Sequence, residues 1–240
     1  MSARLALVAA LVAAPQAVAA DQKTGFLTRT FKNADGTESP YVVFVPHDYD
    51  GTRPYPVILF LHGSGETKGG KKMPVQVGIG TYIKAHEKTF PFITLVPQAE
   101  TRNWRADGPN AERALKMLDE VTRDYKTDPN RVILTGLSMG GYGTWSLAAA
   151  HPEKWAAIVP ICGGGNPKDA GKIKDIPTWA FHGDQDKAVP VQKSREMVEA
   201  LKQAGGHPKY TEYPGVGHES WDQAYATPEL WPWLAEQKKK

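Results

Sequence analysis

Apolar runs alternate with amphipathic segments along most of the chain. The runs are rich in β-branched residues, and several are continuous, as expected for strands that are covered on both faces. They are Tyr41–Val45, Val57–Leu61, Phe92–Val96, Val132–Thr135, Ala157–Ile161, Thr178–Phe181 and Tyr210–Tyr213. Turn-forming residues at Asn33–Gly36 and Gly51–Pro56 separate early strands and indicate an antiparallel N-terminal edge of the sheet.

Helical spacing of apolar side chains occurs between these runs. In Asn110–Tyr125 the apolar positions share one helix face, and Asn110 is predicted to cap the start. A second helix is predicted over Pro190–Ala204, with its proline in the first turn and the pair Gly205-Gly206 as its stop. This alternation predicts an α/β fold, a mostly parallel twisted sheet with helices on both faces. The chain shows no repeat and no long linker, so we expect a single domain over residues 21–240.

The first 20 residues have a different character. Arg4 gives a short positive start, Leu5–Ala14 is an apolar run, and Ala17–Ala20 supplies the small residues of a cleavage site. These are the three parts of a secretory signal peptide, and the run is shorter than the roughly 20 residues that span a bilayer. We therefore predict a mature chain that starts near Asp21, a secreted or periplasmic location and no membrane span.

Charge and cysteine content exclude several classes of partner. The formal charge of +3 falls to +2 without Arg4, and Lys238–Lys240 supply +3 of it, so the globular part is near neutral. The small basic cluster of Lys68, Lys71 and Lys72 has no interleaved aromatic residues, so we expect no nucleic-acid partner. One cysteine excludes an internal disulfide framework, and no histidine spacing matches a metal motif. We predict no metal and no cofactor.

The chain carries a nucleophile motif where a strand meets a helix. Residues 136–140 read Gly-Leu-Ser-Met-Gly, directly after the predicted strand Val132–Thr135 and before a helical stretch over Tyr142–Ala150. This is the G-x-S-x-G elbow in the strand–turn–helix context that it requires. The tight turn would lift the Ser138 hydroxyl above the sheet edge, beside the positive end of the helix. Ser138 is therefore the predicted nucleophile.

The general base must lie at the carboxyl ends of the strands, on the same side as Ser138. His151 and His207 follow helices, which places them at the opposite edge. His182 and His218 are both on the correct side, but His182 stands directly at a strand end, where a structural role is favoured. His218 lies in a glycine-rich loop and completes the order Ser, acid, His, so it is the predicted base.

Two carboxylates follow the strand that precedes the base. Asp184 and Asp186 lie just beyond Phe181, whereas Asp175 precedes the strand and falls on the wrong side. Asp184 is well placed to bond the backbone of its own turn, as aspartates in turns commonly do. The residues favour Asp186 as the acid that orients His218, and they leave Asp184 as the alternative.

An oxyanion needs two backbone N–H donors. We predict that Met139, which follows the nucleophile, supplies one, and that Ser64 in the glycine-rich loop after the second predicted strand supplies the other. Gly65 is the next candidate in that loop, and it is also a candidate substrate contact. Trp104 and Trp221 lie near the predicted catalytic edge, and either could line a substrate pocket.

These motifs carry a family resemblance over nearly all of residues 26–236. In Leu61–Glu66, Gly136–Trp145, Phe181–Asp186 and Tyr213–His218 the chain resembles secreted α/β-hydrolases of the dienelactone hydrolase and prolyl-oligopeptidase-like esterase group. It is also similar to proteins called predicted peptidases or phospholipase/carboxylesterases, and to feruloyl esterases and polyhydroxybutyrate depolymerases. The resemblance places the acid four residues after the histidine of a His-Gly pair, which implies Asp186.

The chain departs from these relatives at two places. Dienelactone hydrolases proper use cysteine as the nucleophile, so Ser138 argues against that particular activity. Relatives often have Arg-Gly after the first-loop Gly-x-Gly-Glu, where this chain has Thr67-Lys68.

Function follows from the motifs and from one short connection. Lids of the resembling fold insert between the strands that correspond to Ala157–Ile161 and Thr178–Phe181, where this chain has only residues 162–177. We expect no cap domain and an open cleft that accepts accessible or bulky esters, either small molecules or esters attached to a polymer. The predicted protein is a monomeric serine hydrolase that cleaves carboxylic esters through an acyl-enzyme. The alternatives are a prolyl-oligopeptidase-like serine peptidase and a catalytically inert carbohydrate- or surface-binding module.

Overall fold

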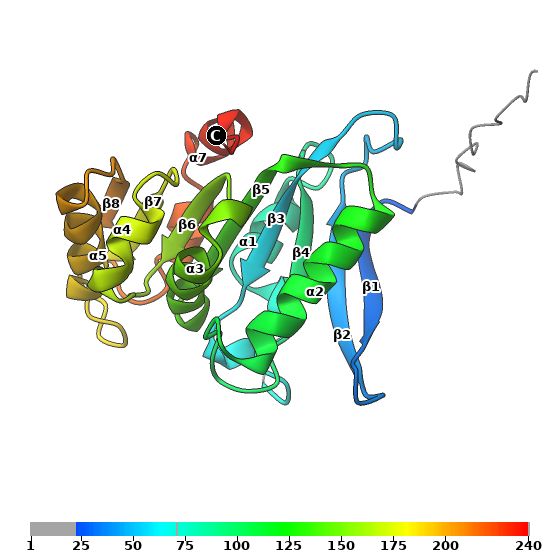
Figure 1. The fold of residues 1–240 in the computed structure, drawn as a ribbon, viewed down its shortest axis with the longest axis horizontal. Coiled ribbons are helices and arrows are strands. Elements are labelled where there is room, and N and C mark those ends of the chain that lie inside the picture. Colours follow the sequence, from blue (N-terminus) through cyan, green and yellow to red (C-terminus); the bar gives the residue numbers. More distant parts are fainter. Residues whose placement is uncertain (1–22, 71, 240) are drawn as a thin grey trace, which may run out of the picture.

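One eight-stranded sheet organises the molecule. The computed structural model describes residues 23–70 and 72–239, so the predicted signal peptide lies outside the described residues. The strand order is β1-β2-β4-β3-β5-β6-β7-β8 (Figure 1). The strands are β1 Gly25–Lys32, β2 Glu38–Val45, β3 Tyr55–Leu61, β4 Ile93–Pro97, β5 Thr127–Leu137, β6 Ala157–Ile161, β7 Trp179–Gly183 and β8 Lys209–Tyr213. Strand β2 pairs antiparallel with β1 and β4, and the other neighbours pair in parallel, so the predicted mostly parallel sheet with an antiparallel edge is confirmed.

The helices interrupt the strands as the pattern predicted. They are α1 Ile79–Ala85, α2 Pro109–Asp124, α3 Met139–Ala150, α4 Ala170–Ile173, α5 Gln192–Gln203, α6 Trp221–Tyr225 and α7 Leu230–Glu236. Short 3-10 turns accompany them in the described part of the chain, η1 Ser64–Glu66, η2 Pro74–Gln76, η3 Pro152–Lys154 and η4 Pro167–Asp169. The short helices α1, α4, α6 and α7 and the first strand, β1, were not predicted individually.

The predicted helix cap at Asn110 is wrong. Gly108 is the N-cap of α2, and Pro109 takes the first helical position, because its fixed φ and missing N–H suit that place. The Asn110 side chain is buried instead in the loop before the helix. Its oxygen accepts a hydrogen bond from the Glu100 N–H at 3.0 Å, and its amide donates to the Thr101 carbonyl at 3.1 Å. Asn110 therefore fixes the connection between β4 and α2.

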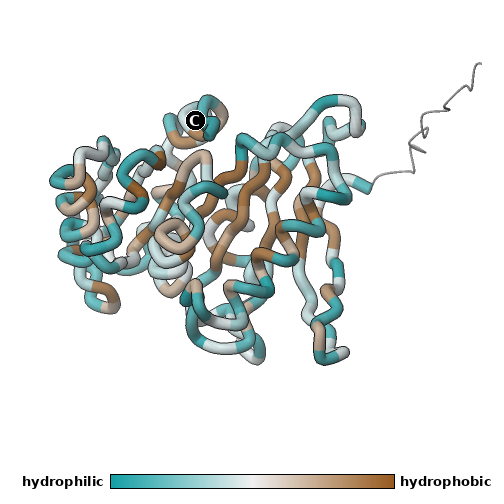
Figure 2. Tube along the Cα trace, in the orientation of Figure 1, coloured by the Kyte–Doolittle hydropathy of each residue, from teal (hydrophilic) through white to brown (hydrophobic). Residues whose placement is uncertain are grey.

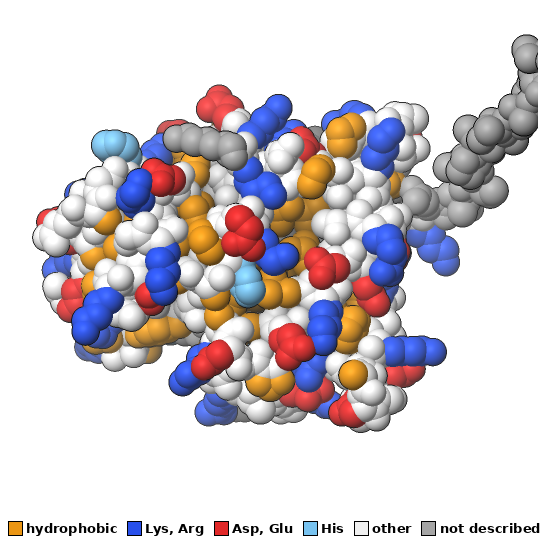
Figure 3. Space-filling view, in the orientation of Figure 1, with side chains coloured by type: hydrophobic (Ala, Val, Ile, Leu, Met, Phe, Trp, Pro, Cys, Tyr) orange, Lys and Arg blue, Asp and Glu red, His pale blue; other side chains and the backbone are white. Residues whose placement is uncertain are grey.

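Two apolar layers cover the sheet, one on each face. Side chains of α2, α3, α4 and α5 belong to one buried cluster with the sheet, and those of α1, α6 and α7 belong to the other. In Figure 2 the hydrophobic segments concentrate in the central strands, between these helices. Figure 3 shows basic and acidic side chains interspersed over the face that carries α2 and α3.

The connection from β6 to β7 is short. It contains the turn η4 and the four-residue helix α4, so no cap domain is inserted there. Among the residues that the structure describes, none of the helices has the length and apolar character needed to cross a membrane. The carboxyl ends of the parallel strands, where the predicted site residues lie, are therefore not covered by an inserted domain at this connection.

Candidate active site

Ser138 occupies a strained turn between β5 and α3. Its backbone has φ 52° and ψ −115°, a left-handed conformation that non-glycine residues rarely adopt. Its N–H donates to the Ile161 carbonyl at 2.9 Å, which ties the turn to β6. Only glycine fits at Gly140, since a Cβ there would lie 1.8 Å from the Leu61 carbonyl oxygen. The motif therefore folds as strand, sharp turn and helix, and α3 begins at Met139, directly after the serine.

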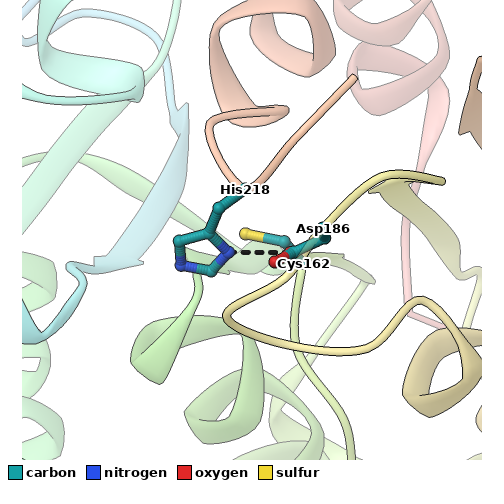
Figure 4. A group of neighbouring side chains, drawn as sticks. All are labelled: Cys162, Asp186 and His218. Atoms are coloured by element: carbon teal, nitrogen blue, oxygen red, sulfur yellow. Dashed lines mark hydrogen bonds and ion pairs between the residues drawn. The ribbon is translucent and has the colours of Figure 1, made fainter. Parts of the chain in front are cut away.

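The structure brings the three predicted catalytic side chains into one hydrogen-bonded chain. His218 Nε2 lies 3.0 Å from Ser138 Oγ, and His218 Nδ1 lies 2.7 Å from Asp186 Oδ2. Figure 4 shows the imidazole and the carboxylate facing one another, with the Cys162 sulfur beside them. The carboxylate can only accept, so Nδ1 carries the proton and Nε2 is free to accept the serine hydroxyl proton.

Asp186 is held as a buried anion. Its side chain has no exposed surface, and its Oδ1 accepts the N–H groups of Ala188 and Val189, both at 2.8 Å. Burial acts to raise the pKa of this carboxyl, but the hydrogen bonds from His218, Val189 and Ala188 outweigh it and keep the pKa below its ordinary value. The carboxylate therefore stays ionised and fixed in direction beside the imidazole.

Asp184 has a different job from the one that the sequence suggested. Its Oδ1 accepts the Gly215 N–H at 2.8 Å, in the loop that carries His218, rather than bonding its own turn. Asp186 is the residue that bonds the backbone of its own turn. The alternative assignment of Asp184 as the partner of His218 therefore finds no support in the geometry.

His182 is fully buried at the end of β7, and it also reaches Asp186. Its Nε2 lies 3.1 Å from Asp186 Oδ2 and 2.9 Å from the Val189 carbonyl, and its Nδ1 lies 2.7 Å from Ser194 Oγ. Burial lowers the pKa of this imidazole. The structural role predicted for His182 stays a prediction, but its contact with the candidate acid was not foreseen.

Cys162 lies beneath the same group of side chains. It is fully buried, its backbone has φ 39°, and its Sγ accepts the Ser138 N–H at 3.2 Å. One ligand atom each of Cys162, Asp186 and His218 lies within 4.8 Å of the others, a set that could hold a metal ion. Burial raises the pKa of the thiol, and the other two groups already bond each other, so thiolate ligation is disfavoured here. The sulfur serves instead as an acceptor behind the nucleophile.

The two predicted oxyanion donors stand at the starts of two helical segments. Met139 is the first residue of α3, and Ser64 is the first residue of η1, positions at which a helix leaves the N–H without an internal acceptor. Both residues line the same cavity as Ser138. Their N–H groups therefore remain the predicted donors to an oxyanion formed beside Ser138.

A buried histidine that the sequence reasoning missed supports the Ser64 loop. His62 Nε2 accepts the Ala99 N–H at 2.9 Å, and its Nδ1 donates to the Gly63 carbonyl at 2.6 Å. Burial lowers the pKa of His62 to about 4, so the ring is neutral near pH 7. The Trp104 indole donates to the His62 carbonyl at 2.9 Å. The available signal was the histidine itself, at the end of an apolar strand and before a glycine-rich loop.

A cavity of about 520 Å³ opens beside the serine. Its lining includes Ser64, Ser138 and Met139, together with aromatic and apolar side chains from several elements. These are Trp104, Tyr142, Trp145, Ile173 and Met197. Of the predicted substrate contacts, Trp104 lines this cavity, Gly65 lines a neighbouring hollow with Lys68 and Lys72, and Trp221 lines neither. The Trp221 ring packs edge-on against His218, with 5.4 Å between ring centroids.

Comparison with known proteins identifies the family. Residues 38–226 match the model of the dienelactone hydrolase family. A probable feruloyl esterase C of Aspergillus terreus is 24% identical over 185 residues, which are 75% of this chain and 66% of that protein. A solved thermostable esterase is 37% identical with a TM-score of 0.76, over 89% of this chain and 63% of that one.

A peptidase also shares the fold. The acylaminoacyl peptidase of Pyrococcus horikoshii matches with a TM-score of 0.70 at 16% identity, over 92% of this chain and 43% of that one. The chain thus spans just under two thirds of the length of the feruloyl esterase and of the solved esterase. Because the family match takes in most of the sequence, from β2 to the end of α6, the chain belongs to the dienelactone hydrolase family, with an α/β-hydrolase fold.

Proposed function

We propose that this protein is a serine hydrolase that cleaves carboxylic esters. The observation that carries the proposal is the continuous chain from Ser138 Oγ through His218 to Asp186, with steps of 3.0 and 2.7 Å, at the wall of a cavity. A nucleophile, a base and an acid in this order are the parts that acyl transfer needs. The relatives named as esterases support the same reaction class.

In the first half-reaction the ester is converted to an acyl-enzyme. Ser138 Oγ attacks the carbonyl carbon while His218 Nε2 takes the hydroxyl proton, and Asp186 stabilises the imidazolium that results. The carbonyl oxygen becomes an oxyanion, which the N–H groups of Ser64 and Met139 stabilise. When the tetrahedral intermediate collapses, the C–O bond of the alcohol breaks and His218 returns the proton to the departing oxygen.

In the second half-reaction water replaces the alcohol. His218 takes one proton from the water while the water oxygen attacks the acyl carbon, and the same two N–H groups stabilise the new oxyanion. Collapse of this intermediate breaks the bond to Ser138 Oγ, and the proton on His218 returns to the serine. The products are a carboxylic acid and the restored enzyme.

The cavity favours esters of aromatic or other bulky acids. Its volume of about 520 Å³ lies within the common range for small-molecule sites, and Trp104, Tyr142 and Trp145 present ring surfaces along it. Aromatic acyl groups pack well against such rings. The short β6–β7 connection supports an open cleft, through which an ester attached to a polymer could reach Ser138.

Covalent labelling tests the proposed chemistry directly. A fluorophosphonate probe should label the folded wild-type protein and should fail to label Ser138→Ala, because the probe reacts only with an activated serine. Melting temperature of the variant serves as the control for folding. A folded wild-type protein that takes no label would refute the proposal and would leave the binding module as the better interpretation.

Substrate pairs separate an esterase from a peptidase. Initial rates on 4-nitrophenyl acetate, a feruloyl ester and a dipeptide anilide should rank both esters well above the anilide. A kcat/KM for the anilide that equals or exceeds the values for the esters would favour the peptidase alternative, whose fold the acylaminoacyl peptidase shares.

We further propose that residues 1–20 direct export and are removed. Expression of the full chain in a bacterium, followed by N-terminal sequencing of the exported protein, should give a chain starting near Asp21. Retention of the intact N-terminus in the cytoplasm would contradict this proposal.

A further inference from the structure

A second buried histidine shares the acceptor atom on which His218 depends. Asp186 Oδ2 lies 2.7 Å from His218 Nδ1 and 3.1 Å from His182 Nε2. The contact is enclosed, because neither the His182 nor the Asp186 side chain has exposed surface. Nothing in the reaction described above uses His182.

The surroundings of His182 determine which of its nitrogens carries the proton. Nε2 faces Asp186 Oδ2 and, at 2.9 Å, the Val189 carbonyl oxygen. A carbonyl oxygen and an ionised carboxylate can only accept hydrogen bonds. Nε2 must therefore be the N–H of the neutral ring. Nδ1, at 2.7 Å from Ser194 Oγ, then accepts a hydrogen bond from the serine hydroxyl, for which the Gly163 carbonyl oxygen at 3.1 Å is the other acceptor in range. Burial keeps the ring neutral by lowering its pKa.

We propose that His182 is a positioning residue whose Nε2–H, shared between Asp186 Oδ2 and the Val189 carbonyl, weakens the hold of Asp186 on protonated His218. A carboxylate oxygen that already accepts one hydrogen bond offers less negative charge to a second donor. The imidazolium of His218 is then less stabilised than it would be beside a carboxylate oxygen with no other side-chain donor. His182 would thus extend activity toward acidic pH. This inference rests on the proposed Ser138–His218–Asp186 chemistry.

Other titratable groups around this pair have their own partners or stay neutral. Cys162, at the end of β6, and Tyr142, on α3, both lie near Asp186, and burial raises the pKa of each. Glu212 on β8 faces His182 and is paired with Arg195 on α5 at 2.5 Å. Among these described groups, His182 is the one whose side chain bonds the carboxylate together with His218.

Two substitutions separate the hydrogen bond from the bulk of the ring. In His182→Gln the side-chain amide stands where Nε2 stood and can still donate to Asp186. In His182→Asn the shorter amide replaces Nδ1 and reaches toward Ser194, so Asp186 loses its second side-chain donor. The exposed His207 gives a matched control, His207→Gln, in which the same change is made away from the site.

The readout is the pH dependence of fluorophosphonate labelling, which reports His218 acting on Ser138 without a substrate. In His182→Asn the acid limb of the pH profile of labelling should move to higher pH by about half a unit, which lowers the labelling rate about threefold at acidic pH. His182→Gln and His207→Gln should keep the wild-type limb. A limb that stays in place or moves down in the folded Asn variant, or that moves equally in Asn and Gln, would overturn the proposal.

A measurement on the wild-type chain covers the case in which the variants do not fold. Long-range proton–nitrogen NMR of the imidazole rings should show His182 with a proton on Nε2 and none on Nδ1 near pH 7. The opposite tautomer would overturn the proposal. Failure of wild-type labelling at every pH would instead refute the proposed function, and the NMR result would still decide whether Asp186 receives the second N–H.

Discussion

The nucleophile and the base are held in different ways. The elbow, Gly136–Gly141, is clamped by backbone contacts, and four of its six residues are buried. The histidine loop, Pro214–Ser220, is largely exposed and is held by a few hydrogen bonds. In two of these the Gly215 N–H donates to Asp184 Oδ1 and the Gln185 N–H donates to the Val216 carbonyl. Steric exclusion therefore fixes the position of Ser138, whereas polar contacts from the β7 loop fix the position of His218.

This difference predicts where each region is vulnerable. A backbone clamp fails when a single atom is added, because the neighbouring carbonyls cannot move away without breaking the sheet. A loop on hydrogen bonds tolerates added atoms on its exposed side but loses its position when an acceptor is removed.

The largest expected effect comes from adding one methyl group to the elbow. In Gly140→Ala the new Cβ would meet the Leu61 carbonyl oxygen at 1.8 Å, which forces the nucleophile turn apart. We expect loss of fluorophosphonate labelling and a fall in unfolding free energy of about 3 kcal/mol or more. Gly217→Ala is the matched change in the histidine loop, where no described atom beyond the two chain neighbours lies within 4 Å of the new Cβ. It should label at near wild-type rate, and equal damage in both variants would show that the two regions are held alike.

The next effect separates the two aspartates that support the histidine loop. In Asp186→Asn the amide can present its N–H₂ to His218, which favours the wrong imidazole tautomer, and kcat should fall by about 10³–10⁴-fold. In Asp184→Ala the Gly215 N–H loses its acceptor, which loosens the loop at a cost of about 1 kcal/mol and a loss of activity of about tenfold or less. Ester hydrolysis measured at constant pH gives the loss of activity in each of the two variants. Comparable losses in the two variants would contradict the assignment of separate roles.

Sequence reasoning succeeded where the information is local. The strand-turn-helix at Ser138 follows from five consecutive residues, and the parallel order of the sheet follows from the alternation of apolar runs with helices. The position of His218 at the same edge followed from topology alone. Each of these inferences needed only spacing along the chain and the rule that parallel strands end at one edge.

The contacts that the sequence did not reveal are long-range and specific to atoms. Asp184 was expected to bond its own turn, but its Oδ1 accepts a hydrogen bond from the N–H of Gly215, 31 residues away. Cys162, which follows β6, reaches the N–H of Ser138, which follows the neighbouring strand β5, 24 residues away. No residue type in these segments indicates which of several polar partners will be in range once the chain has packed.

Acid should lower the free energy of unfolding through His62, which directly follows β3 and packs beside Gly140 of the elbow. Its pKa is about 4 in the folded protein against an ordinary 6.5, so the unfolded chain takes the proton first as the pH falls. The stability that His62 contributes is full above about pH 6.5 and is lost progressively toward pH 4, by about 2–3 kcal/mol.

Urea unfolding at pH 7 and pH 4 measures this effect. His62→Gln keeps a polar side chain without a titrating ring, so it should lose less stability than the wild type over that interval. The same substitution at the exposed His207 should leave the wild-type pH dependence in place. A His62→Gln variant that is destabilised by acid as much as the wild type would place the acid-sensitive group elsewhere.

The smallest expected effect concerns which region shapes the substrate. The cavity takes Met139, Tyr142, Gly143, Trp145 and Ser146 from α3, the helix that follows the elbow, whereas Trp221 beside His218 lies outside its lining. Tyr142 is 40% exposed at this wall, so Tyr142→Ala should remove ring contact with a bulky acyl group without disturbing the core. The ratio of kcat/KM for a feruloyl ester to that for an acetyl ester should fall by about fivefold, or about 1 kcal/mol.

Trp221→Phe should leave this ratio unchanged even if both rates fall, because Trp221 contacts the base and not the cavity. If Trp221→Phe changed the ratio and Tyr142→Ala did not, the histidine loop would supply the substrate contacts, and the elbow side would supply only the nucleophile.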